Sequence, residues 1–260
     1  MKAKTTVEII NVTKNKGSPK FIVDTTIGQF KFSDDTIVNN LVLKGKTFTL
    51  EEFEKIQEFE KRTEVFNKVL NYISYQMRSE FEIKQYLSEK NVEADDIEKI
   101  LDKIKSFGYV NDYELAKSAF DSSVKRKKGP KFLERKLIEK HISKDIIKEI
   151  LGKYNFNLEL ELAKDVANKV AEKKISEPVK KQKQLVFNKL SYDGFSNEVI
   201  NIALSDLNFI DNSEQKLENE CKKLLYKYRS EESNKKNNKI IASLLRKGFE
   251  YSDILKKINE

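Results

Sequence analysis

The chain has 260 residues, of which 38% are hydrophobic and 35% charged, and its formal net charge is +8 at pH 7. Only 8 glycines and 3 prolines are present, which argues against a barrel or a sandwich and favours long helices. A single cysteine excludes internal disulfides and favours a reducing cytoplasm, and the sequence has no apolar run of about 20 residues that could span a membrane. The first residues, MKAKTTVEII, lack the apolar core of a signal peptide, so we expect a cytoplasmic protein.

Residues 1–48 predict a small β-rich module. Apolar residues and turn signals place three strands at 7–10, 21–23 and 30–32. Ile37, Val38 and Leu41 then indicate a short helix that closes before Gly45. A module of this size is too small for a secure core of its own, so we expect it to pack on the segment that follows.

A long helix is predicted after the module. Thr49 and Glu52 have the spacing of a capping box, in which each side chain bonds the backbone N–H of the other residue. Apolar residues at helical spacing then continue to about Tyr75.

From residue 65 onward the sequence repeats itself. Each unit has a long helix, a second helix that ends in a recurring motif, and a short apolar third helix. The motif begins at Leu87, Leu137, Leu190 and Leu244, with spacings of 50, 53 and 54 residues. Its fifth position is Asn91, His141, Gly194 and Gly248, and Asn and Gly are typical of a left-handed helix C-cap.

These units predict a mainly helical protein of about four tandem three-helix bundles in an elongated crescent, with the β-rich module at its N-terminus. The domains are then expected at 1–48 for the module, 49–112 for the linking helix and first repeat, and 113–157, 158–212 and 213–260 for the other repeats.

Basic residues recur in blocks along the repeats. Residues 113–153 carry 12 basic and 6 acidic groups, 164–189 carry 8 and 3, and 222–247 carry 9 and 2. Such faces attract polyanions, or a protein assembled on one. The alternative is that they are solvated helix ends whose cations complement the helix dipole.

Three groups of cations are the candidate binding residues. The first contains Lys125, Arg126, Lys127, Lys128, Lys131, Arg135 and Lys136; the second contains Lys173, Lys174, Lys180, Lys181 and Lys183; the third contains Lys222, Lys223, Lys227 and Arg229, followed by Lys235, Lys236 and Lys239. In the first group Gly129 ends one helix, and Pro130 suits the first position of the next.

The sequence offers no catalytic constellation, so we expect neither enzyme activity nor a cofactor. His141 is the only histidine, which excludes a multi-histidine metal site and leaves this imidazole without catalytic partners. Cys221 lies on a predicted helix and is interpreted as a packing residue. The pairs Asp34-Asp35 and Asp95-Asp96 are interpreted as helix starts.

Two segments resemble the RecX family. Residues 76–87, QMRSEFEIKQYL, look like its first repeat, in which Arg-Ser-Glu opens the second helix. Residues 108–117, GYVNDYELAK, followed by Lys128-Gly129-Pro130 and by 137–142, are similar to its second repeat. The resemblance covers nearly the whole chain, most strongly residues 65–152, and His141 stands where the family usually has Gly.

The resemblance implies a cytoplasmic modulator of RecA that acts in DNA repair and the SOS response. RecX proteins lie in the groove of the RecA filament on single-stranded DNA, hinder strand exchange, and damp ATP hydrolysis and coprotease activity, with no catalytic residues of their own. We therefore expect a monomer that binds this filament, with DNA itself as a second partner and no membrane. Blocking, end-capping and stripping of the filament all fit.

Two other functions stay open. Tandem three-helix bundles with basic faces also resemble helix-turn-helix modules, which predicts strongly salt-dependent binding of DNA without RecA. A helical scaffold whose lysines only solubilise it predicts binding to neither DNA nor filament.

Overall fold

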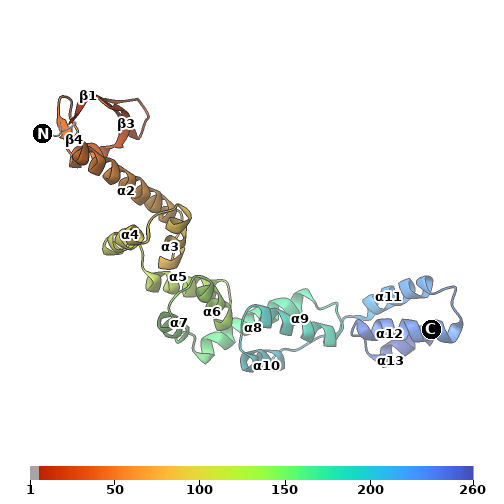
Figure 1. The fold of residues 1–260 in the computed structure, drawn as a ribbon. Helices are drawn as coiled ribbons and strands as arrows, with labels where there is room; N and C mark the ends of the chain where they lie inside the picture. Colours follow the sequence, from red (N-terminus) through yellow and green to blue (C-terminus); the bar gives the residue numbers. More distant parts are fainter. Residues whose placement is uncertain (1–5, 260) are drawn as a thin grey trace. The chain divides into compact units, whose positions relative to one another are not determined.

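The computed structural model of the protein describes residues 6–259 (Figure 1). It divides into two compact units, and the boundary between them along the chain lies between Asn111 and Asp112. Helices dominate both units, and every strand of the described residues lies in the N-terminal module, so the predicted mainly helical fold with a β-rich N-terminal module is confirmed. Within residues 6–259 no helix is long and apolar enough to cross a membrane.

The N-terminal module contains one strand more than predicted. Its antiparallel sheet has the order β3-β2-β1-β4, with β1 at Thr6–Lys14, β2 at Lys20–Thr25, β3 at Gly28–Ser33 and β4 at Thr47–Thr49. The prediction missed β4 because three residues are too short to show alternation. The strand forms through its partner: Val7 of β1 pairs with Phe48, and both side chains are buried.

Two helices cover the sheet. The short helix α1 (Asp34–Asn39) follows β3, and α2 (Leu50–Ser74) follows β4. The predicted capping box of α2 is confirmed, since the Thr49 and Glu52 backbone N–H groups donate to each other's side chains at 2.8 and 3.2 Å. Phe53 and Ile56 of α2 are buried in the core of the module, so the module packs on the linking helix as expected.

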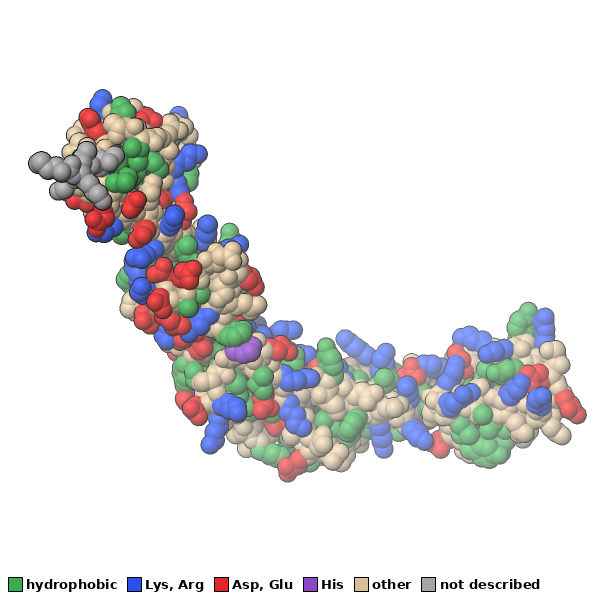
Figure 2. Space-filling model, in the orientation of Figure 1, with side chains coloured by type: hydrophobic (Ala, Val, Ile, Leu, Met, Phe, Trp, Pro, Cys, Tyr) green, Lys and Arg blue, Asp and Glu red, His purple; other side chains and the backbone are tan. Residues whose placement is uncertain are grey.

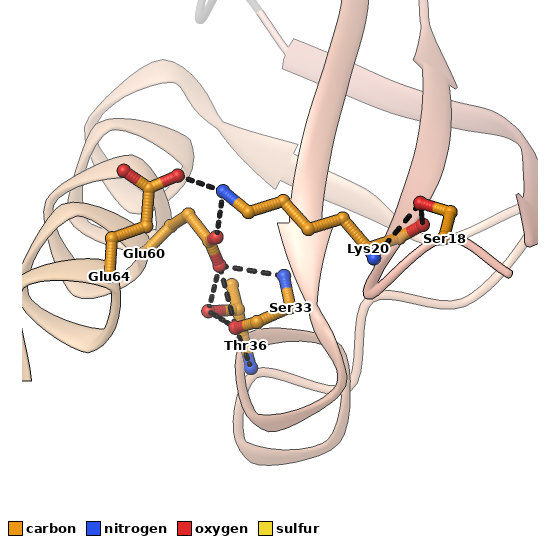
Figure 3. A network of polar contacts seen from close by, with 6 residues as sticks. All are labelled: Ser18, Lys20, Ser33, Thr36, Glu60 and Glu64. Carbon is orange, nitrogen blue, oxygen red and sulfur yellow. Dashed lines mark hydrogen bonds and ion pairs between the residues drawn. The ribbon is translucent and has the colours of Figure 1, made fainter. Parts of the chain in front are cut away.

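A buried carboxylate also fastens α2 to the module (Figure 3). One oxygen of Glu60 accepts hydrogen bonds from the Ser33 N–H and hydroxyl, both at 2.8 Å, and from the Thr36 hydroxyl at 2.5 Å. Its other oxygen lies 2.9 Å from the Lys20 ammonium. Ser33 is itself the N-cap of α1, so this single side chain holds β2, β3 and α1 against α2.

The first repeat is built on the C-terminal half of α2. It adds α3 (Glu80–Glu89) and α4 (Ala94–Ser106), and all three helices share one core. Ser79 caps α3 in a second capping box with Glu82, which explains why a serine and an acidic residue open this helix. Asp95 and Asp96 lie in the first turn of α4, as predicted.

The second unit contains the other three repeats, each with its own hydrophobic core. The second repeat is α5 (Asp112–Lys125), α6 (Pro130–Glu139) and α7 (Lys144–Leu151); the third is α8 (Phe156–Lys173), α9 (Val179–Tyr192) and α10 (Asn197–Ser205); the fourth is α11 (Glu214–Lys227), α12 (Ser233–Arg246) and α13 (Tyr251–Asn259). Pro130 occupies the first turn of α6 behind Gly129, as predicted. Cys221 is buried in the fourth core, which confirms its packing role.

The recurring leucine motif ends the second helix of every repeat in the same way. Asn91, His141, Gly194 and Gly248 all have positive φ, between 54° and 92°. The N–H of the next residue bonds the carbonyl of the leading leucine, as in Phe195 to Leu190 at 3.2 Å. His141 keeps this geometry with φ of 54°, although the side chain makes the left-handed conformation less favourable than it is for glycine.

Candidate functional site

Three of the predicted cations form an exposed end to the second repeat. Lys125 ends α5, Arg126 follows it, and Lys131 lies in the first turn of α6; all three are exposed. Arg135 is also exposed, and Lys136 is half-buried, further along α6. Figure 2 shows such cations spread over the second unit, with acidic side chains interspersed among them in this view.

The other two cations of the first group contact the third repeat. Lys127 forms an ion pair with Asp165 of α8, and this hydrogen bond raises the lysine pKa. Lys128 lies 2.6 Å from Asp193, which is only 2% exposed. The acidic side of this second pair is therefore almost wholly removed from solvent.

These contacts belong to a junction at which residues 127–132 of the second repeat pack against residues 192–194 of the third. The Gly129 N–H donates to the Asp193 carbonyl at 2.8 Å, and the Lys131 N–H donates to the Gly194 carbonyl at 3.0 Å. A Cβ atom on Gly129 would lie 2.5 Å from the Gly194 carbonyl, so the two backbones touch directly. We call this contact the 2–3 junction.

A half-buried tyrosine completes the 2–3 junction. The Tyr154 hydroxyl donates to the Lys128 carbonyl at 2.9 Å. Burial, with the Glu159 carboxylate adding to it, raises the pKa of Tyr154 to about 12, so the hydroxyl stays protonated as a donor at neutral pH. Lys189 reinforces Asp193 from within α9, at 2.7 Å.

Sequence reasoning selected Lys128 but missed its partners. One signal was present: Asp193 precedes the C-cap glycine of the third repeat, where the other three repeats have Lys90, Lys140 and Lys247. A single acid at a position where the other repeats have lysine indicates that a cation lies beside it, because a buried carboxylate needs a partner of opposite charge.

The second group lies around the turn between α8 and α9. Lys173, Lys174, Lys180 and Lys183 are exposed, and the Lys183 ammonium lies 5.5 Å from the centre of the Phe209 ring. Lys181 is half-buried because its backbone and Cβ face Gly248 of the fourth repeat. Among residues 6–259 no hydrogen bond or ion pair joins a side chain of this group to one of the first group.

The third group is mostly exposed, and three of its lysines form ion pairs with glutamates. Lys222 lies 2.6 Å from Glu218, and Lys223 lies 3.1 Å from Glu220. The hydrogen bond from Lys222 holds the pKa of Glu218 below its usual range, and those from Lys247 and Lys223 lower the pKa of Glu220. Lys239 pairs with Glu231. Lys227 lies over the ring of Tyr228 and Arg229 over that of Tyr226, while Lys235 is exposed and Lys236 half-buried.

Reactive side chains do not cluster in the described part of the chain. Among residues 6–259 no group of three His, Cys, Asp or Glu side chains has the arrangement of a metal site. Cys221 is buried, and this burial raises the pKa of its thiol, which disfavours the reactive thiolate.

Known proteins are similar to this chain in sequence and in its three-helix domains. The RecX first three-helix domain matches residues 66–103, and the RecX third three-helix domain matches residues 212–258. The regulatory protein RecX of Staphylococcus carnosus is 32% identical over 231 residues, which cover 87% of this chain and 86% of the relative. That of Listeria welshimeri is 30% identical over 251 residues, covering 95% and 93%.

Solved structures agree with the sequence relatives. A crystal structure of regulatory protein RecX superposes with a TM-score of 0.61 at 23% identity, covering 77% of this chain and 100% of that one. The crystal structure of RecX from Lactobacillus salivarius superposes with a TM-score of 0.52 at 27% identity, covering 57% and 97%. Because the Listeria welshimeri and Staphylococcus carnosus relatives are 30% and 32% identical over 95% and 87% of this chain, the chain belongs to the RecX family of regulatory proteins.

Proposed function

We propose that the protein binds the RecA filament on single-stranded DNA and inhibits strand exchange, ATP hydrolysis and coprotease activity. The observation that carries the proposal is the exposed cationic end of the second repeat, in a chain whose relatives are named regulatory proteins. Lys125, Arg126 and Lys131 have no acidic partner among the described residues, so their charge is available to a polyanionic assembly.

The tandem repeats suit a filament because it presents the same surface at regular intervals. The 2–3 junction fixes two repeats to each other through backbone hydrogen bonds, so cations on both can engage neighbouring sites at once. Several weak contacts joined in this way give tight overall binding without a deep pocket.

The protein is expected to lower RecA-dependent ATP hydrolysis on single-stranded DNA when it is present below the concentration of RecA. The reason is that one molecule bound in the filament affects more than the protomer it touches. The measurement is the steady-state hydrolysis rate as the protein is titrated. An unchanged rate at equimolar protein contradicts the proposal.

The same titration separates the filament from bare DNA. Tight and strongly salt-dependent binding to naked single-stranded DNA, with no added affinity for RecA-coated DNA, would favour a stand-alone nucleic-acid-binding protein. Binding to neither would favour a scaffold. We expect the RecA-coated strand to bind more tightly.

Charge removal at the second repeat is expected to weaken filament binding more than the same change in the fourth. Lys125→Ala with Lys131→Ala removes two unpaired exposed cations and should reduce affinity about tenfold. Lys222→Ala with Lys223→Ala is the matched control, because glutamates already neutralise both lysines. Equal losses of filament affinity in the two double variants would show that the second repeat is not the contact.

A further inference from the structure

A hollow of about 370 Å³ opens beside the 2–3 junction. Arg126, Phe132, Arg135, Lys136, Glu139 and Tyr192 line it, so three cations and two aromatic rings surround it with one acid. Tyr192 belongs to the third repeat and the others to the second, which means that the hollow exists only while the junction is formed.

The charges of the three cations in this hollow are not neutralised by acidic side chains in the described part of the chain. Among residues 6–259 no acidic side chain forms an ion pair with Arg126, Arg135 or Lys136. The Arg135 guanidinium donates to the Tyr192 carbonyl at 3.2 Å, which holds it beside the aromatic side chain. Guanidinium groups held in place are well suited to phosphate oxygens.

The aromatic rings offer a second kind of contact. Tyr192 is 71% exposed although it lies at the end of a helix whose other face is buried. The Lys128 ammonium lies 5.3 Å from the Phe132 ring centre and 5.9 Å from that of Tyr192. Lys128 is itself paired with Asp193, but Arg126, Arg135 and Lys136 line the same hollow without an acidic partner among the described residues. An exposed ring beside such cations is a combination that binds single-stranded nucleic acids, with bases stacked on the ring and phosphates near the charge.

The corresponding hollow between the third and fourth repeats has a different composition. There Arg246 stands where Tyr192 stands, two residues after the leading leucine. Two acids, Glu177 and Glu220, also line it, and they form ion pairs with Lys216 and Lys247. The pairing of exposed aromatic ring and unneutralised cations is therefore a property of the 2–3 junction and not of the repeat architecture.

We propose that the hollow at the 2–3 junction binds one nucleotide of single-stranded DNA. The ring of Tyr192 stacks on the base, and Arg126, Arg135 and Lys136 hold the adjoining phosphate. This inference rests on the proposed function: within the RecA filament, the second and third repeats contact the single-stranded DNA.

The test compares fluorescently labelled oligothymidylate with an abasic oligonucleotide of the same length, which carries the same phosphates without bases. Fluorescence anisotropy of the full-length protein is expected to give about tenfold tighter binding to the strand with bases. Tyr192→Ala should remove most of this preference and Tyr192→Phe should keep it. Arg126→Ala and Arg135→Ala should weaken binding to both strands and each reduce the salt slope by about one.

Arg246→Ala is the matched control, because it alters the equivalent position at the next junction and should leave the preference unchanged. A preference that is the same in Tyr192→Ala, or that is lost equally in Arg246→Ala, overturns the inference. Circular dichroism melting of each variant shows that the fold is retained.

Failure here is distinguishable from failure of the proposed function. If wild-type protein inhibits RecA ATPase but shows no preference for the strand with bases, the nucleotide site is wrong and filament binding stands. If the preference is present without inhibition, the filament proposal is wrong and the nucleotide site stands.

Discussion

Gly194→Ala is expected to separate the second and third repeats, whereas Gly248→Ala, at the same position of the next repeat, should cost far less. Both glycines have strongly positive φ, of 86° and 92°, so alanine loses about 1 kcal/mol of backbone energy at either place. The difference between the two variants must therefore come from their neighbours.

The surroundings of the two glycines differ in what can move. A Cβ atom on Gly194 would collide with the backbone nitrogen of Phe132 and lie 2.9 Å from its Cα, and backbone cannot rotate away. A Cβ atom on Gly248 would meet the Lys181 Cβ at 3.3 Å, a contact that a small shift relieves. The Gly194 variant must also give up two backbone hydrogen bonds and the ion pair of Lys128 with Asp193 across the junction, for a total of about 3 kcal/mol or more.

Amide hydrogen exchange is the appropriate measurement because tandem repeats need not unfold in one step. The Gly129 and Lys131 N–H groups bond across the junction, and their exchange should accelerate about a hundredfold in Gly194→Ala. The exchange rates of amides in the core of the third repeat should change far less. Equal acceleration at Gly129 in both variants would mean that the close approach of the two backbones contributes nothing.

Local rules predicted most of the helical part of the fold. The capping box at Thr49, the proline that opens α6 and the left-handed caps at Asn91 and Gly194 are each determined by residues within one turn of the chain. The leucine motif recurs because each copy ends a helix in the same way and folds the following apolar residue back onto that helix.

Features that depend on distant residues were not predicted. The strand β4 exists because β1, some forty residues earlier, offers it hydrogen bonds, and its own three residues have no strand pattern. The two lysines Lys127 and Lys128 were grouped with exposed cations, but their acidic partners Asp165 and Asp193 lie 38 and 65 residues away. Charge counts along the sequence cannot separate a cation that faces solvent from one that fastens two repeats together.

Glu60→Gln is expected to destabilise the N-terminal module by about 2 kcal/mol at pH 7, with little effect on the second unit. The carboxylate is 5% exposed and accepts three hydrogen bonds on one oxygen, from Ser33 and Thr36, while Lys20 faces the other (Figure 3). The amide keeps the shape but has no charge, and its NH₂ group has no acceptor where the Lys20 ammonium lies.

The sign of the pH dependence follows from the pKa of Glu60. Burial by itself raises this pKa, but the hydrogen bonds from Thr36 and Ser33 and the Lys20 ammonium outweigh it, so the net shift is downward. A carboxyl group whose pKa is lower in the folded state stabilises the fold above its unfolded pKa of about 4.3. That contribution is lost as the pH falls from there through the folded-state pKa.

The measurement is the free energy of unfolding of the module in wild type and Glu60→Gln, from denaturant titrations monitored by hydrogen exchange within β1 and β2, at several pH values from 7 to 3. The difference between the two proteins should shrink on acidification, because protonated Glu60 is as uncharged as glutamine. Glu64→Gln is the control on the same helix: it faces the same lysine but its side chain is 39% exposed, so its loss should stay below about 0.5 kcal/mol. A difference for Glu60→Gln that is constant with pH would show that shape, and not the buried charge, is what joins the module to α2.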